Sequence, residues 1–128
     1  MSGMIKLFVA RYDEGKVYKH WSLFVENPGK EFIIHVIGSA GNWKFEEKRR
    51  NPRVSKTLIE LIDVTEIHVD QIPELRRAAQ SVPLDQNRQS SFDCQNFVLM
   101  VIDKAIEEEL IQVSDSYLDS IFAKRDGL

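Results

Sequence analysis

The sequence predicts an α+β fold, with strands in the first half of the chain and helices in the second. Segments rich in aromatic and β-branched residues dominate positions 4–37, and a turn signal, Asn27-Pro28-Gly29, interrupts them. The clearest helical periodicity begins only after residue 92. This order favours an antiparallel sheet with helices packed against it. At 128 residues, the chain is expected to form a single domain over positions 1–128.

The turns between the expected strands have a physical basis. In Asn27-Pro28-Gly29, proline fixes φ and glycine accepts the positive φ that follows, so residues 17–37 predict a β-hairpin. Residues 38–52 are polar and contain glycine, which predicts a loop or a frayed strand. The expected strands cover residues 4–10, 17–25, 31–37 and 56–69.

Three helices are expected after the strands. Asp70 is expected to cap a short helix with Pro73 in its first turn, and Ser114 to cap the last helix. The strongest helix signal covers residues 93–111. The side chains expected to be buried are Leu75, Ala78 and Ala79 in the first helix, Phe97, Val98, Val101, Ile102 and Ala105 in the second, and Leu118, Ile121 and Phe122 in the last.

Composition excludes several classes of function. The net charge of −3, from 17 basic and 20 acidic residues, argues against a nucleic-acid partner. No apolar run approaches the roughly 18 residues that span a bilayer, and no secretory signal is visible, so a cytoplasmic protein without an integral membrane segment is expected. An N-terminal signal that had been removed would make it a secreted protein instead. No nucleotide-binding or metalloprotease motif occurs, so neither a cofactor nor a metal is expected.

Cys94 is the only cysteine, and it lies at the predicted start of a helix. The N–H groups and the positive dipole end of a first helical turn favour a thiolate and can stabilise an oxyanion. Asp93 or Ser91 is expected to cap this helix, and the polar loop before it suggests a position in a cleft. A lone cysteine is, however, more often a small buried apolar residue, and that reading stays open.

Two of the three histidines are expected to lie close together. With a two-residue hairpin loop, Asn27 pairs with Lys30, and His20 and His35 become diagonal neighbours on one face of the sheet. A loop one residue longer would put them on opposite faces. The alternative is that one strand histidine faces solvent and the other packs without a function. His68, at the end of a strand, is expected to be an edge residue.

Two segments resemble a known family. YKHWSLFVENPGKEFIIHVIG (residues 18–38) resembles the histidine block of the lecithin–retinol acyltransferase-like family, and SFDCQNFVLMVIDKA (residues 91–105) resembles its cysteine block. The histidine-before-cysteine order is that of the circularly permuted papain-like (NlpC-type) branch, to which the PPPDE-type isopeptidases also belong. The resemblance implies a papain-like domain with Cys94 as nucleophile at a helix N-terminus, His20 as general base and His35 as the residue that orients it.

These features together predict a cysteine-dependent hydrolase or acyltransferase, such as a thiol protease. Its substrate would be a protein, a peptide or another acyl compound with an amide, isopeptide or ester carbonyl. Gln95 is expected to polarise that carbonyl and Trp21 to line the cleft, although Gln95 also suits a plain first-turn residue and Trp21 a core position opposite His20. Asp93 and Asn96 stand where the family usually has Asn and His. The alternative is therefore an inactive papain-like domain that acts as a protein-interaction module.

Overall fold

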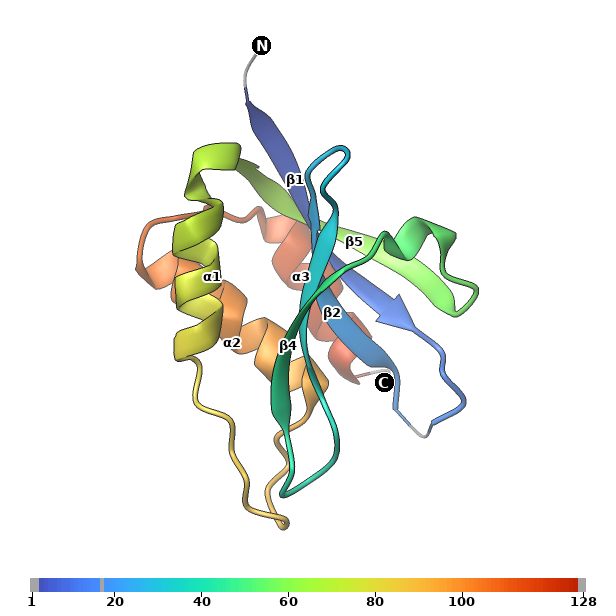
Figure 1. Ribbon diagram of the computed structural model, residues 1–128. Coiled ribbons are helices and arrows are strands. Elements are labelled where there is room, and N and C mark those ends of the chain that lie inside the picture. Colours follow the sequence, from blue (N-terminus) through green and yellow to red (C-terminus); the bar gives the residue numbers. More distant parts are fainter. Residues whose placement is uncertain (1–2, 17, 127–128) are drawn as a thin grey trace.

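The computed structural model describes residues 3–16 and 18–126 and has one antiparallel sheet with three α-helices packed on it (Figure 1). The strand order is β4-β3-β2-β1-β5. The α+β class that the sequence predicts is thereby confirmed. The strands are β1 (Met4–Tyr12), β2 (His20–Glu26), β3 (Phe32–Ile37), β4 (Lys44–Arg49) and β5 (Leu58–His68). The helices are α1 (Ile72–Ser81), α2 (Cys94–Glu107) and α3 (Asp115–Asp126), and two short 3₁₀ turns are η1 (Pro52–Val54) and η2 (Val69–Gln71).

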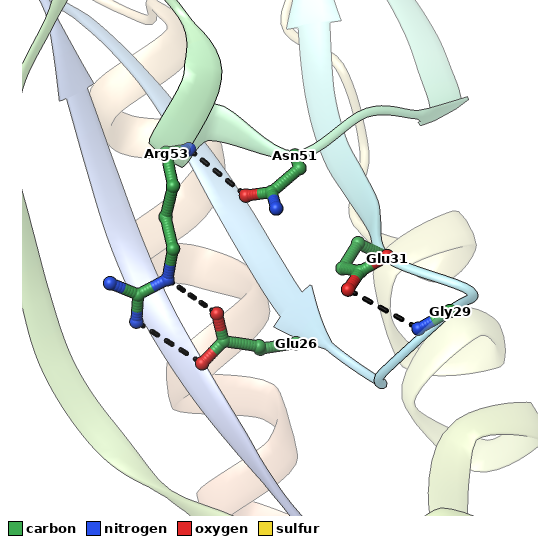
Figure 2. A network of polar contacts seen from close by, with 5 residues as sticks. All are labelled: Glu26, Gly29, Glu31, Asn51 and Arg53. Atoms are coloured by element: carbon green, nitrogen blue, oxygen red, sulfur yellow. Dashed lines mark hydrogen bonds and ion pairs between the residues drawn. The ribbon is translucent and has the colours of Figure 1, made fainter.

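The β2–β3 hairpin has the predicted two-residue loop. The Lys30 N–H donates to the Asn27 carbonyl at 2.8 Å, and the strands pair from Val25–Phe32 to Leu23–Ile34. Gly29 has φ of 78°, and its N–H donates to the Glu31 carboxylate (Figure 2). Because this register aligns Ser22 with His35, the side chains of His20 and His35 leave the same face of the sheet.

All three helices cover one face of the sheet. Alternate residues of β2 and β3 point into the main core, where Trp21 and Ile34 are fully buried. Each helix adds apolar side chains to the same core, including Leu75 from α1, Val98 from α2 and Ile121 from α3. Trp21 therefore packs on the face opposite His20.

The opposite face carries a second apolar cluster, formed by Phe8, Ala10, Tyr12, Phe24 and Ile33. The chain that connects the two edge strands, β4 and β5, crosses this face (Figure 1). Within the crossing segment, the Arg53 guanidinium lies 5.4 Å from the centre of the Phe8 ring and binds both carboxylate oxygens of Glu26 (Figure 2). Asn51 caps η1 by accepting from the Arg53 N–H at 3.0 Å (Figure 2). These contacts fasten the crossing segment over the sheet.

Three local expectations need correction, and one is confirmed. Within the segment expected to be a loop or a frayed strand, residues 44–49 form the regular edge strand β4. Asp70 does not cap a helix with its side chain; instead, its N–H donates to His68, which caps η2. Ser114 caps α3 as predicted, by accepting from the Tyr117 N–H. Only one edge of α3 meets the sheet, so Tyr117 and Ile121 are buried, whereas Leu118 and Phe122 are 37% and 60% exposed.

None of the helices in the described part of the chain is long and apolar enough to cross a membrane.

The fold predicts that both faces of β3 contribute to stability. Ile33 and Ile34 are fully buried on opposite faces, so replacing either with alanine is expected to cost about 2–5 kcal/mol of unfolding free energy. Ile59→Ala is the matched control because Ile59 is 45% exposed, and its cost should stay below about 1 kcal/mol. Urea denaturation measures all three. If Ile33→Ala lowered the free energy of unfolding no more than Ile59→Ala does, burial of the second face would be contradicted.

Candidate active site

His20, His35 and Glu46 form a linear chain of hydrogen bonds. His20 opens β2, His35 lies in the middle of β3, and Glu46 is the direct partner of His35 on β4. Nε2 of His20 lies 2.9 Å from Nδ1 of His35, and Nε2 of His35 lies 2.7 Å from Oε1 of Glu46. Antiparallel pairing brings these three side chains from neighbouring strands onto one face.

The carboxylate at one end of this chain determines the tautomers of both rings. Ionised Glu46 only accepts hydrogen bonds, so Nε2 of a neutral His35 must carry the proton and Nδ1 must carry the lone pair. That lone pair accepts from Nε2–H of His20. In neutral His20 the remaining nitrogen, Nδ1, is then unprotonated. The Glu46–His35–His20 hydrogen-bond chain thus ends in a basic nitrogen, Nδ1 of His20.

Both imidazoles are neutral at pH 7. Burial is the main cause that lowers the pKa of His20, to about 4, and the neighbouring His35, Lys16 and Arg50 lower it further. Burial also lowers the pKa of His35, and the opposing effect of Glu46 does not reverse this direction. The hydrogen bond from His35 in turn holds the pKa of Glu46 below its usual range. Glu46 is therefore a carboxylate at pH 7, as the tautomer argument requires.

Cys94 is the first residue of α2, as predicted, and Asp93 is its N-cap. One carboxylate oxygen of Asp93 accepts the N–H groups of Gln95 and Asn96, each at 3.0 Å. The Asn96 side chain in turn accepts from the Asp93 N–H and completes a capping box. Two of the first-turn N–H groups that were expected to stabilise an oxyanion thus already donate to Asp93. The N–H groups of Cys94 and Gln95 also help to lower the thiol pKa.

The start of α2 is attached to the backbone at the start of β2. The carbonyl of Lys19 accepts from the Gln95 side chain at 3.0 Å and lies 3.9 Å from Sγ of Cys94. In the described chain, β2 and β3 form no pair beyond Leu23–Ile34, although the register would next align Trp21 with Val36. The Trp21 N–H that a continued ladder would use instead lies close enough to the Cys94 sulfur to lower the pKa of its thiol.

The thiol is buried and neutral, whereas its place at a helix start favoured a thiolate. Cys94 is 1% exposed, and burial is the main cause that raises the pKa of its thiol, to about 11. The negative charge of Asp93 adds to this rise, and nearby backbone N–H groups only partly oppose it. Loss of hydration outweighs the helix N-terminus here, because desolvation penalises the charged form of the thiol.

One pocket of about 220 Å³ is lined by Cys94 and by all three residues of the hydrogen-bonded chain. Cys94 belongs to the helix side of the sheet and His20 to the opposite side, and both line this pocket at the point where β2 and β3 have separated. Among the described residues, Sγ and the His20 ring make no direct hydrogen bond. The pocket therefore brings the predicted nucleophile and base to one cavity without direct contact.

The other predicted site residues take structural positions. Gln95 is 1% exposed, and its side-chain amide donates to the carbonyl of Lys19. This bond attaches the helix to the residue before β2 and occupies the amide that was expected to polarise a substrate carbonyl. The Trp21 indole is fully buried in the main core, and only its backbone N–H approaches the sulfur. No group of three His, Cys, Asp or Glu residues within positions 3–16 and 18–126 is arranged to hold a metal ion.

Sequence reasoning missed Glu46. Its strand, KFEEKR, has few apolar residues and was expected to be a loop or a frayed strand. A signal was present in the alternation of Phe45, Glu47 and Arg49 with Glu46 and Lys48, which a second hairpin after β3 would place on two faces.

Comparison with known proteins gives a family but no described relative. Residues 7–112 match the model of a family described as a family of unknown function (DUF6540). No curated protein matches the chain, and no solved structure does.

The low pKa of His20 predicts a loss of stability in mild acid. Between pH 6.5 and about 4 the unfolded chain binds a proton at His20 that the folded chain excludes, so stability falls as the pH falls through this window. The contribution of His20 is at most about 3 kcal/mol. Denaturant titrations at several pH values should show this slope, and His20→Gln should reduce it. An equal slope in His20→Gln would contradict the assignment.

The buried thiol predicts slow alkylation of the folded protein. With a pKa of about 11, Cys94 should react with iodoacetamide at pH 7 about 100-fold more slowly than in the unfolded chain, even before steric protection is counted. Asp93→Asn should accelerate the reaction because asparagine keeps the cap but removes the charge that raises the thiol pKa.

Asp115→Asn is the matched control, since it removes a carboxylate from the first turn of another helix. It should leave the alkylation rate unchanged. A folded wild-type protein that is alkylated rapidly below pH 7 would show that Cys94 is a thiolate and would refute this description of the site.

Proposed function

The chain belongs to this family of unknown function (DUF6540), and from its own site we propose that it is a cysteine-dependent hydrolase or acyltransferase of the circularly permuted papain-like type. The observation that carries the proposal is the Glu46–His35–His20 chain, which ends in an unprotonated nitrogen and shares one pocket with Cys94. A thiol nucleophile needs a base whose ring is oriented by a further polar group, and here two successive groups provide that orientation.

The chemistry starts from a neutral thiol and a neutral imidazole. Sγ of Cys94 attacks the carbonyl carbon of an amide, isopeptide or ester while its proton passes to His20. His20 then protonates the leaving group, and a thioester on Cys94 remains. Water or a second nucleophile attacks this thioester, and the proton returns to sulfur as the acid or the transferred acyl group departs.

Two features of the pocket suit this sequence of steps. The backbone N–H groups of Trp21 and Cys94 oppose the rise in the thiol pKa, and in this mechanism the same groups would stabilise the oxyanion. Substrate binding has to bring Sγ and His20 within hydrogen-bond reach, a tightening that is common on passing from a free enzyme to its complex. A low-dielectric pocket strengthens the attraction between the thiolate and the imidazolium once they form.

A second candidate function is a binding module without catalysis. The burial of Cys94 and its raised thiol pKa favour it, because an unreactive cysteine at a helix start also stabilises the core by packing. In that case the pocket recognises a protein or peptide group, and the histidine chain serves to organise polar contacts.

Hydrolysis of p-nitrophenyl acetate by the full chain separates these candidates. The enzyme reading predicts acetylation of Cys94, seen by mass spectrometry, and a rate that falls at least 100-fold in Cys94→Ala. Because His20 must be unprotonated, the rate should rise through about pH 4 and stay level from about pH 5 to 9.

If neither Cys94→Ala nor His20→Gln changed the rate of p-nitrophenyl acetate hydrolysis, the binding module would remain as the function. A rate that rises only near pH 8–9 and ignores His20 would indicate an ordinary thiolate rather than the proposed pair.

A further inference from the structure

Three cations line the same pocket as Cys94 and the histidine chain. Lys48 and Arg50 follow Glu46 at alternate positions, so they share its face, whereas Arg49 lies on the other face and donates to the Gly29 carbonyl at 3.2 Å. Lys16, between β1 and β2, lines the pocket as well. Two separate chain segments thus bring positive charge to one cavity.

None of these cations forms a salt bridge among the described residues, although Lys48 and Arg50 lie near enough to Glu46 to help lower its pKa. Arg50 donates to the Ser55 hydroxyl at 3.1 Å and lies 5.4 Å from the centre of the Tyr12 ring, so its guanidinium is held in place by neutral groups. The whole chain carries a net charge of −3, so unpaired cations gathered at one pocket are not a consequence of a basic composition.

The charges that line the pocket leave an excess of one positive charge. Its two carboxylates are Glu14 and Glu46, and Glu46 is committed to His35. Both histidines are neutral at pH 7, since the cations lower the pKa of each ring in addition to burial. A ligand with a single negative charge would neutralise this excess, whereas a phosphate dianion would exceed it.

Resting on the proposed function, we propose that the substrate is a small acyl compound with one carboxylate, which Lys48 and Arg50 bind while its reacting carbonyl lies at Cys94. Arginine binds carboxylates through paired N–H donors, and lysine adds a mobile charge. Lys16, from the segment between β1 and β2, would add a third positive charge to the same pocket. The cavity of about 220 Å³ accommodates an acid of a few carbon atoms beside the sulfur.

Two matched esters test the proposal by binding alone. Monomethyl succinate carries one carboxylate and one ester, and dimethyl succinate is its neutral counterpart. Each is titrated into the full chain with Cys94→Ser, so that no turnover occurs, and the imidazole C–H signals of His20 and His35 are followed by NMR. Monomethyl succinate should bind at least tenfold more tightly than the neutral diester, and added salt should weaken it.

Substitutions then locate the carboxylate. Lys48→Gln with Arg50→Gln should weaken the binding of monomethyl succinate at least tenfold, and Lys48→Gln alone, at an exposed position, at least threefold. Arg49→Gln removes the same charge from the opposite face and should change the affinity less than twofold. Equal weakening by Arg49→Gln, equal affinity for both esters, or tighter binding of inorganic phosphate than of monomethyl succinate would overturn the proposal.

Turnover of the same esters by the chain that retains Cys94 separates this inference from the proposed function. Hydrolysis that depends on Cys94 but does not distinguish the two esters would overturn the carboxylate inference and leave the thiol mechanism intact. Selective binding of monomethyl succinate without hydrolysis of either ester would support the carboxylate site and remove the support for the thiol mechanism.

Discussion

The site depends on the place where β2 and β3 separate. Their ladder ends at Leu23–Ile34, three residues after β2 begins, so the first residues of β2 have backbone groups that β3 does not use. The Trp21 N–H is one of these groups and lies close to the Cys94 sulfur, and the carbonyl of Lys19, the residue before β2, accepts from the Gln95 side chain. Because buried backbone groups need partners, the position of Cys94 follows from the position of this gap.

The same gap lets two faces of one sheet contribute to a single pocket. Cys94 approaches from the helix side, while His20 and His35 lie on the side crossed by the β4–β5 connection. That connection also carries Arg50, and it is held over the sheet by the bonds between Arg53 and Glu26. The edge strand and its crossing are therefore part of the site, since they supply the terminal carboxylate and two of the three cations, Lys48 and Arg50.

Burial keeps both members of the proposed catalytic pair, Cys94 and His20, uncharged before a substrate binds. It raises the pKa of the Cys94 thiol and lowers that of His20, so both groups are neutral over a wide pH range. Proton transfer from thiol to imidazole is then unfavourable until a substrate supplies partners for the developing charges. Under the proposed mechanism a reactive thiolate would exist only during turnover, which would protect the cysteine from adventitious oxidation and alkylation.

The sequence predicted those features of the site that depend on short local segments, namely the hairpin register and the start of α2. Asn27-Pro28-Gly29 predicted the hairpin register and thereby the contact between His20 and His35, and Asp93 predicted the start of α2. It did not predict the burial of Cys94, because the preceding loop is polar in composition although Phe92 packs edge-on against Trp43 at 6.1 Å. Glu46 was missed since an edge strand with exposed charges lacks the apolar alternation that marks a strand.

The most direct test of the account is the tautomeric state of the two histidines, measured by ¹⁵N NMR of the imidazole nitrogens at pH 7. The Glu46–His35–His20 chain predicts protonated Nε2 and unprotonated Nδ1 in both rings. Glu46→Gln should disturb this state, because glutamine can donate as well as accept, whereas Glu47→Gln, on the other face of β4, should preserve it. A proton on Nδ1 of His20 in the wild-type protein would contradict the account, since no lone pair would then be available to take the proton of Cys94.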